Sequence, residues 1–389
     1  MSIELRPYQQ AAVDAVLHEW DIGHHKTLLV LPTGCGKTIC FAKIAESQVR
    51  VGNRVLILAH RGELLEQAAD KIAKATGLKC AVEKAEQTAL QSWYRITVGS
   101  VQTLMREKRL SQFSPDYYDT IIIDEAHHSI SDSYQNVLNY FSNARVLGVT
   151  ATPDRSDMRN LGQIYDSLAY EYKLPQAIKA GYLSQIVAQT IPLQLDIAHV
   201  GMAAGDYKVG ELGTALEPYL DKIAEEMVTY AKDRKTVVFL PLVETSKKFC
   251  RYLRKYGFKA AEVNGNSQDR AEVLKDFEDG KYNVLCNSML LTEGWDCPSV
   301  DCIIVLRATK SRSLYSQMVG RGTRLHEGKE NVLLLDFLWN TERHELCRPA
   351  HLISKDEDVA KKMTEKLEEA TGPIDIEELE KESESDVVA

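Results

Sequence analysis

The sequence predicts an α/β protein of two tandem domains, each a parallel β-sheet covered by helices, followed by an acidic C-terminal region. Short runs of apolar and β-branched residues recur along the chain, and helical patterns lie between several of them. This alternation is typical of a parallel sheet, whose neighbouring strands need a helical crossover. The series of runs starts again in the second half of the chain, and 389 residues are long enough for two such domains.

The first series of runs is expected to form the strands of the first domain. An amphipathic stretch follows the first run, at residues 39–49, and predicts a helix directly after that strand. The runs themselves lie at residues 27–31, 55–59, 96–98, 120–123 and 146–149.

A joining region around residues 154–234 leads to the second series. Within it, residues 184–193 look strand-like, whereas residues 196–213 combine several glycines with few apolar pairs and are expected to form an exposed loop or insertion. The runs of the second domain lie at residues 236–240, 260–263, 284–286, 302–306 and 332–335. The predicted boundaries are 1–176 for the first domain, 177–345 for the second and 346–389 for the C-terminal region.

The C-terminal region is expected to be a helix followed by a mobile acidic tail. Residues 351–389 contain 13 acidic and 5 basic side chains, so they hold −8 of the total net charge of −9. A helical pattern at 355–370 closes at Thr371-Gly372-Pro373, and few large apolar groups follow to anchor a further element. A solvated tail is the simpler interpretation, and a tail that binds a protein partner or competes with nucleic acid is the alternative.

The composition favours an intracellular protein without a membrane segment. The N-terminus has no basic region leading into a long apolar one, and no apolar run approaches 18 residues. The eight cysteines are scattered without zinc-site spacing, which predicts reduced thiols and no zinc. A nearly neutral chain outside the acidic region neither supports nor excludes a nucleic-acid partner.

The segment LPTGCGKT at 31–38 predicts a phosphate-binding loop between a strand and a helix. Its backbone N–H groups and the positive helix end would hold phosphates, Lys37 would neutralise charge and the Thr38 hydroxyl would reach Mg²⁺. Leu31 replaces the usual first glycine of this motif. The residues expected to contact the nucleotide here are Pro32, Thr33, Gly34, Cys35, Gly36, Lys37 and Thr38.

The segment DEAH at 124–127 supplies a second half of the same site. Asp124 ends an apolar run and is expected to hold Mg²⁺ together with Thr38, while Glu125 would orient an attacking water. The neighbouring His127 and His128 are not expected to bind a metal, because adjacent side chains point apart and no further ligands accompany them.

These residues are part of a series of segments that resembles the motifs of superfamily 2 helicases, in the family's order, over most of residues 3–340. The further segments are LRPYQQ (5–10), LAHRGELLEQ (58–67), TVGSVQT (97–103), TAT (150–152), VVFLPLVETS (237–246), VNGNSQDR (263–270), NSMLLTEGWDCPSVD (287–301) and QMVGRGTR (317–324). LRPYQQ, EGWD and SLYSQMVGRGTRL together resemble the bacterial and phage branch near the RadD and XPB-like DNA helicases. The resemblance implies two tandem RecA-like domains, ATP and Mg²⁺ as cofactors, and the cytoplasm of a bacterial or phage-infected cell.

The resemblance also implies roles for individual residues. Arg6 and Gln9 would recognise adenine, although Gln9 could instead cap a helix. Gly294 and Asp296 would contact the nucleotide, and Thr150 and Thr152 would couple hydrolysis to movement. Gln317, Arg321 and Arg324, with the two arginines expected to open a helix, would act in catalysis from the second domain. Contacts to the nucleic-acid backbone are assigned to Arg61, Gly99, Ser100, Gln102 and Thr292, with helix caps or turns as the alternative.

The function that fits best is an ATP-dependent helicase or translocase that acts as a monomer on DNA with little regard to base sequence. An RNA helicase is the first alternative, since the short motifs do not read the 2′-hydroxyl. A DNA-stimulated motor subunit of a larger repair, replication or restriction assembly is the second. A small-molecule kinase is disfavoured because it would leave the second domain and its arginines unexplained.

Overall fold

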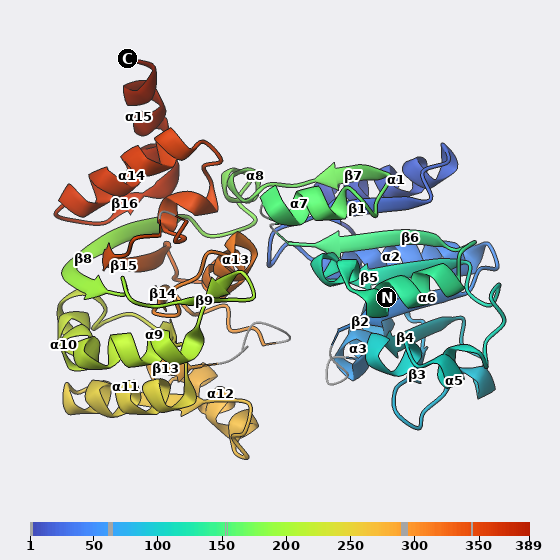
Figure 1. The fold of residues 1–389 in the computed structure, drawn as a ribbon, viewed down its shortest axis with the longest axis horizontal. Coiled ribbons are helices and arrows are strands. Elements are labelled where there is room, and N and C mark those ends of the chain that lie inside the picture. Colours follow the sequence, from blue (N-terminus) through green and yellow to red (C-terminus); the bar gives the residue numbers. More distant parts are fainter. Residues whose placement is uncertain (1–2, 61–64, 152, 154, 289–294, 344) are drawn as a thin grey trace. The chain divides into compact units, whose positions relative to one another are not determined.

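The computed structural model describes residues 3–60, 65–151, 153, 155–288, 295–343 and 345–389, which form two compact units, Met1–Lys173 and Leu174–Ala389 (Figure 1). Each unit contains one seven-stranded sheet with helices packed on it. The predicted α/β class with two parallel sheets is therefore confirmed.

The sheet of the first unit is parallel throughout, in the order β3-β4-β2-β5-β6-β1-β7. A parallel sheet places the carboxyl ends of all its strands at one edge. Its strands are β1 (Lys26–Val30), β2 (Val55–Ala59), β3 (Cys80–Glu83), β4 (Ile96–Ser100), β5 (Thr120–Asp124), β6 (Arg145–Thr150) and β7 (Ser167–Glu171). Its helices are α1 (Pro7–Asp21), α2 (Lys37–Arg50), α3 (Leu65–Thr76), η2 (Ala89–Gln91), α4 (Val101–Leu104), α5 (Glu107–Leu110), η3 (Ala126–Ile130), α6 (Asp132–Tyr140) and α7 (Arg155–Leu161).

Alternate strand residues of the first unit face two helical layers. Leu28, Leu56 and Ile121 lie in one apolar cluster with residues of α4, α6 and α7. Leu29 and Ile122 are equally buried and point to the opposite face, because side chains alternate along a strand. Helix α2 packs between α1 and α3, and none of the three contributes residues to that cluster. Burial on both faces explains why the central strands are continuous apolar runs that the sequence reveals.

All five strands predicted for the first unit are present, but the prediction missed its two edge strands. In β3 only alternate residues are buried, and most residues of β7 are half-exposed. A strand that is covered on fewer sides needs fewer apolar residues, so neither segment forms an apolar run.

The second unit has the strand order β12-β13-β11-β14-β15-β8-β16, parallel except for β16, which runs antiparallel to β8. Its strands are β8 (Ile186–Asp196), β9 (Met202–Ala203), β10 (Asp206–Tyr207), β11 (Thr236–Phe239), β12 (Ala260–Val263), β13 (Val284–Asn287), β14 (Cys302–Val305), β15 (Val332–Asn340) and β16 (Ile374–Asp375). Its helices are α8 (Leu174–Lys179), α9 (Val209–Leu216), η4 (Glu217–Tyr219), α10 (Leu220–Tyr230), α11 (Val243–Lys255), α12 (Arg270–Glu278), α13 (Arg312–Gly320), η5 (Pro349–Leu352), α14 (Glu357–Glu369) and α15 (Ile376–Val388).

The expected exposed loop at residues 196–213 is wrong for most of its length. Strands β9 and β10 form a small antiparallel hairpin there, and α9 begins at Val209. Tyr207 and Leu212 are buried in the core of the unit, whose cluster also includes α10 and α11. Gly213 lies inside α9, where an added Cβ would come 2.5 Å from Leu242 Cδ1, so this glycine permits close packing and does not mark a turn.

The prediction of a mobile acidic tail after Pro373 is also wrong. Strand β16 pairs with β8, and α15 continues to Val388 beside α14 (Figure 1). Ile376 and Leu379 are fully buried, and Asp375 caps the helix by accepting from the Glu377 and Glu378 N–H groups. The buried residues of α15 recur at helical spacing among acidic ones, and this narrow apolar stripe is enough to dock the helix.

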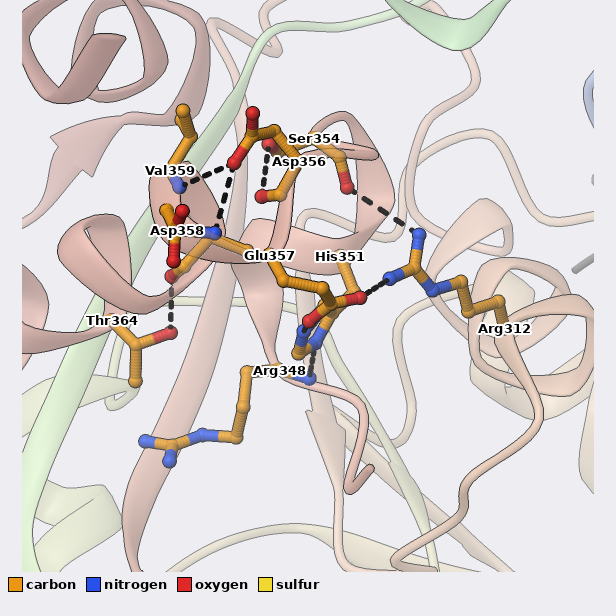
Figure 2. Close-up of polar contacts among 10 residues, drawn as sticks. Arg312, Arg348, His351, Ser354, Asp356, Glu357, Asp358, Val359 and Thr364 are labelled. Atoms are coloured by element: carbon orange, nitrogen blue, oxygen red, sulfur yellow. Dashed lines mark hydrogen bonds and ion pairs between the residues drawn. The ribbon is translucent and has the colours of Figure 1, made fainter. Parts of the chain in front are cut away.

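Polar contacts tie the start of α14 to α13 (Figure 2). The Arg312 guanidinium donates to Glu357 Oε1 at 2.9 Å and to the Ser354 carbonyl oxygen at 3.4 Å. Asp356 caps α14 by accepting from the Asp358 and Val359 N–H groups at 2.9 and 3.1 Å. The segment after residue 345 is thus an integral part of the second unit.

Two further features concern the helices and the cysteines. Among the described helices, none is long and apolar enough to cross a membrane. The eight cysteines are all free thiols, as the sequence predicts, and all except Cys80 are buried.

Removing the Leu379 side chain tests the corrected structure of the C-terminal region. Leu379→Ala should lower the free energy of unfolding by about 2–5 kcal/mol, because it leaves a cavity under α15. Val388→Ala is the matched control: this side chain is 89% exposed, and its loss should change stability by no more than about 0.5 kcal/mol. Chemical denaturation measures both variants. Equal stabilities of Leu379→Ala and the unmodified protein would restore the mobile-tail interpretation.

Candidate active site

The carboxyl edge of the first sheet brings three predicted site segments together. Strands β5, β6 and β1 are neighbours, and each ends at a site segment. The phosphate-loop sequence follows β1, Asp124 ends β5 and Thr150 ends β6. The Leu31 N–H donates to the Thr150 carbonyl oxygen at 3.1 Å, so the loop starts in register with the end of its neighbour.

The loop at 31–38 has the backbone that a phosphate site needs. Gly34 and Gly36 take positive φ angles of 87° and 78°, which side chains other than glycine rarely adopt. Gly36 then starts α2, whose first residue is Lys37. The first N–H groups of a helix have no acceptor within it and carry the positive end of its dipole. The loop therefore presents donors suited to an anion such as a phosphate.

Lys37 and Glu125 form an ion pair between the two motifs. Lys37 Nζ lies 3.0 Å from Glu125 Oε1, and the two side chains are 16% and 17% exposed. The residues are 88 positions apart in the sequence, so only the fold brings them together. A lysine suited to bind a phosphate and an acidic residue suited to polarise water thus lie side by side.

The two acidic residues have different electrostatic surroundings. Burial raises the pKa of Asp124 to about 6, against the attraction of Lys37, and the neighbouring Glu125 charge adds to the rise. Burial also acts to raise the pKa of Glu125, but Lys37, His127 and His128 outweigh it and hold that pKa below its usual value. Glu125 is consequently a carboxylate at neutral pH, as an acceptor for a water proton must be.

The backbone at Glu125 is strained. Its φ and ψ of 54° and 59° are left-handed, which is uncommon for a residue with a Cβ. Its N–H donates to Asp124 Oδ1 at 2.9 Å, which helps to hold this turn. Strain of this kind is found mostly where the surrounding structure fixes a functional side chain in place.

Thr150 lies beside this acidic pair. Its hydroxyl is 3.4 Å from His127 Nδ1, and the same nitrogen is 3.5 Å from Glu125 Oε2. His127 therefore connects the end of β6 to Glu125. The second predicted coupling residue, Thr152, lies outside the described residues.

The N-terminal helix is attached to the phosphate loop. Gln9 Nε2 donates to the Cys35 carbonyl oxygen at 3.1 Å, and the Tyr8 hydroxyl donates to the same oxygen at 2.8 Å. Gln9 Oε1 accepts from the Arg6 N–H at 2.9 Å, so the helix-capping alternative is also observed. The Tyr8 ring stacks on Tyr172 with the centroids 4.3 Å apart. This stack could not be predicted from the sequence, because Tyr172 follows the unpredicted edge strand β7.

The expected Mg²⁺ ligands can be assessed only by their chemistry. Thr38 and Asp124 offer a hydroxyl and a carboxylate, the hard oxygen donors that Mg²⁺ prefers. Glu125 Oε2 is buried and accepts no hydrogen bond from the residues that the structure describes. In the same part of the chain, no group of three or more His, Cys, Asp or Glu side chains could hold a metal. A bound Mg²⁺ would therefore need ligands from the nucleotide or water as well.

The predicted residues of the second unit meet around the end of α13. Gln317 is half-buried on that helix, and Arg321 follows its last residue, so the expectation that the arginines open a helix is wrong. Arg321 Nη1 donates to the Trp295 carbonyl oxygen at 2.6 Å. Arg324 Nη2 lies 3.5 Å from Asp296 Oδ2. Gly294, which precedes these partners, lies outside the described residues.

The residues expected to touch nucleic acid are only partly described. Arg61 and Thr292 lie outside the described residues. Gly99 and the buried Ser100 end β4, and Gln102 is exposed on α4. A Cβ on Gly99 would come 2.8 Å from Leu104 Cδ1, so packing alone explains this glycine.

Two family profiles match the chain. The profile described as "Type III restriction enzyme, res subunit" matches residues 2–155, and "Helicase conserved C-terminal domain" matches residues 219–326. They cover the phosphate-loop and DEAH segments in the first unit and the arginines in the second.

Individual proteins agree with these matches. A Saccharomyces cerevisiae protein assigned as the ATP-dependent helicase IRC3 is 30% identical over 376 residues, which are 91% of this chain and 54% of the relative. The "DNA 3'-5' translocase XPB2" of Sulfurisphaera tokodaii is 27% identical, over 89% of this chain and 84% of the relative. The chain spans about half the length of the yeast relatives that it matches.

Solved structures share the fold. A fragment assigned to the HsdR subunit of a type I restriction enzyme from Vibrio vulnificus aligns with a TM-score of 0.67 at 27% identity, over 86% of this chain and 64% of that one. The DNA-bound restriction-modification enzyme LlaBIII aligns with a TM-score of 0.68 at 17% identity, over 95% of this chain and 31% of that one, which concerns the fold alone.

The parallel sheets and the loop between β1 and α2 define a P-loop protein with two tandem RecA-like domains. With both family matches in place, the chain belongs to the superfamily 2 helicases.

Substituting Gly36 tests the link between α1 and the phosphate loop. A Cβ at Gly36 would come 2.5 Å from Gln9 Nε2 and displace that side chain from Cys35. Gly77→Ala is the matched control, because Gly77 has a similar φ of 76° with nothing within 4 Å. Chemical denaturation should show Gly36→Ala to be less stable than Gly77→Ala by about 1 kcal/mol, the worth of a hydrogen bond. Equal losses would mean that Gln9 does not secure the loop.

Proposed function

We propose that the protein is an ATP-dependent helicase or translocase that acts on DNA. The observation that carries the proposal is the Lys37–Glu125 pair, which joins the phosphate loop and the DEAH segment in one site at 3.0 Å. Membership of the superfamily 2 helicases supports the activity, and relatives named as a DNA translocase and as restriction-enzyme subunits favour DNA.

In this proposal the first unit binds ATP through its loop. The N–H groups of residues 33–38 and Lys37 would hold the phosphates, while Arg6 and Gln9 would contact adenine. Mg²⁺, held by Thr38 and Asp124, would neutralise phosphate charge when bound. Glu125 would accept a proton from the attacking water and orient it toward the γ-phosphate.

In this proposal, a phosphate of ATP replaces Glu125 as the partner of Lys37. Lys37 cannot serve Glu125 and a phosphate with full strength at once, so ATP would draw Lys37 away and leave Glu125 without its main cation. The freed carboxylate would then be able to bind the attacking water. ATP binding would in this way activate the group that the hydrolysis step requires.

Substitutions of the two partners should separate binding from hydrolysis. Lys37→Ala should abolish ATP hydrolysis through weakened phosphate binding. Glu125→Gln should keep ATP binding and lower kcat by roughly 100-fold or more, because the amide cannot accept a proton. Calorimetry and steady-state turnover measure the two effects, with the exposed Lys74→Ala and Glu66→Gln as controls. Normal turnover by Glu125→Gln would remove the proposed role of Glu125.

The arginines of the second unit are proposed to act in the transition state. Arg321 and Arg324 would approach the γ-phosphate when the two units close on ATP. Gln317 would help to position that phosphate. A planar guanidinium can bind phosphate through two hydrogen bonds. Closing on ATP and opening on ADP would move bound nucleic acid.

Arg321→Ala and Arg324→Ala should therefore lower kcat for ATP hydrolysis far more than they weaken ATP binding, by roughly 100-fold or more. Arg251→Ala on the exposed side of α11 is the control and should leave kcat unchanged. Kinetics and equilibrium binding of ATP distinguish the two effects. Loss of binding with normal kcat would place these arginines in ground-state recognition instead.

ATP turnover and strand separation on different nucleic acids distinguish the three candidate functions. ATP turnover with single-stranded DNA, duplex DNA, forked DNA and RNA at one stated salt concentration compares the candidates. Stronger stimulation by DNA supports the proposal, and stronger stimulation by RNA favours the RNA helicase, a class that is also present among the relatives. DNA-stimulated turnover without strand separation on the fork would favour the motor subunit. Absence of stimulation by every polymer would contradict all three.

Residues 99, 100 and 102, with Arg61 and Thr292, are proposed to contact the nucleic-acid backbone. A protein partner at the acidic surface of α15, a monomeric state and a bacterial or phage cytoplasm also stay predictions. Relatives come both from a Lactococcus phage and, by its name, from the mitochondrion of Schizosaccharomyces pombe.

A further inference from the structure

Lys329 lies in the turn between α13 and β15, and its ammonium group is directed at backbone oxygens. Lys329 Nζ donates to the carbonyl oxygens of Gly322 and Arg324, at 2.6 Å each, and to that of Pro298 at 3.2 Å. An ammonium group has three N–H donors, so these acceptors match its full capacity.

The three carbonyls belong to two segments that also meet through the arginines. Gly322 and Arg324 lie in segment 321–324, which begins at Arg321 and ends at Arg324. Pro298 lies in segment 295–298, whose Trp295 and Asp296 are the partners of Arg321 and Arg324. Lys329 therefore joins the backbones of the same two segments that Arg321 and Arg324 connect through their side chains.

Ser184 and strand β15 also contact segment 321–324. The Ser184 N–H donates to the Thr323 carbonyl oxygen at 2.8 Å, and the Ser184 hydroxyl donates to that of Arg324 at 3.0 Å. A Cβ on Gly322 would come 2.5 Å from Val332 Cγ2, so the backbone here lies directly on β15. The segment is held between β15, Ser184 and Lys329.

A lysine after a helix often only caps it, but the contacts here differ. The last carbonyl groups of α13, those of Met318, Val319 and Gly320, already accept from the N–H groups of Arg321, Gly322 and Thr323. Lys329 instead binds carbonyls beyond the helix end and one from a separate segment. These contacts lie where they can hold the segment that follows the helix.

We propose that Lys329 is a positioning residue for ATP hydrolysis, which fixes segment 321–324 on segment 295–298 so that Arg321 and Arg324 are held in place for the transition state. The inference rests on the proposed function of the two arginines. Lys329 acts through them and needs no contact with ATP.

The charge state of Lys329 supplies a readout that a packing role would not. Burial lowers the pKa of Lys329 to about 8, with Arg324 adding to the effect and with Asp301, Cys297 and Asp296 opposing it. Below this pKa the ammonium group can serve all three carbonyls, and above it the neutral amine has only two N–H groups. The arginine segment should loosen as the pH rises through about 8.

Lys329→Met removes the charge while keeping most of the side-chain length. The variant should lower kcat for ATP hydrolysis by roughly 10- to 100-fold, the cost of slight misplacement of catalytic groups, with KM for ATP unchanged because the first unit binds the nucleotide. Lys281→Met is the matched control, since Lys281 is 68% exposed in the same unit and should leave kcat and KM unchanged. Normal kcat in a folded Lys329→Met protein overturns the proposal.

The same substitution in the Arg321→Ala, Arg324→Ala background shows whether Lys329 works through the arginines. Little further loss of kcat is expected there, because residues that act as one unit are not additive. A full additional loss would assign Lys329 a separate role and overturn the proposal.

The pH dependence keeps the proposal testable if Lys329→Met does not fold. In the unmodified protein, kcat should fall as the pH rises through about 8, and in Lys329→Arg, which stays charged, this fall should move to higher pH. An identical fall in both proteins overturns the inference. Failure of the proposed function would look different, because the unmodified protein would then lack DNA-stimulated ATP hydrolysis altogether.

Discussion

The ion pair between Lys37 and Glu125 joins the two segments of the proposed ATP site. Two largely buried charges are costly unless each compensates the other, so the pair requires β1 and β5 to end at the same edge of the sheet. The parallel arrangement provides that geometry, with β6 between them and Thr150 at its end. Positive φ angles at Glu125 and at Gly36, which precedes Lys37, set the backbone path beside the two paired side chains. The proposed activation of Glu125 by ATP follows from exchanging this carboxylate for a phosphate as the partner of Lys37.

In the second unit, backbone contacts hold the segment that carries Arg321 and Arg324. Its arginines are long and flexible, and a catalytic guanidinium is useful only when its backbone is well placed. Here Gly322 lies against β15, and Ser184 donates to the carbonyl oxygens of Thr323 and Arg324. Lys329 donates to that of Arg324 as well and to those of Gly322 and Pro298. Arg312 and Glu357 connect the start of the same helix to α14, so the C-terminal region supports α13 as well. In both units, hydrogen bonds or ion pairs hold the charged side chains that are proposed to act on ATP.

The sequence was sufficient where a feature depends on local pattern. Central strands are buried on both faces and read as apolar runs, and the phosphate loop and DEAH segment follow two of them. Features that depend on packing were missed. Edge strands β3 and β7 are only partly buried, Gly213 serves close helix packing in place of a turn, and Ile376 and Leu379 form too narrow an apolar stripe to stand out among acidic neighbours. The Tyr8–Tyr172 stack and the Lys329 contacts join residues that no short motif relates.

A double-mutant cycle on Lys37 and Glu125 tests whether the phosphate loop and the DEAH segment meet through these two side chains. The free energies of unfolding of the nucleotide-free protein, of Lys37→Met, of Glu125→Gln and of the double variant give the coupling between the two side chains. If the pair joins the two motifs as described, the coupling should be about 1–3 kcal/mol in favour of the intact pair, because removing one partner leaves the other charge buried and uncompensated. A coupling near zero would mean that the phosphate loop and the DEAH segment do not meet, and the proposed site would not exist in this form.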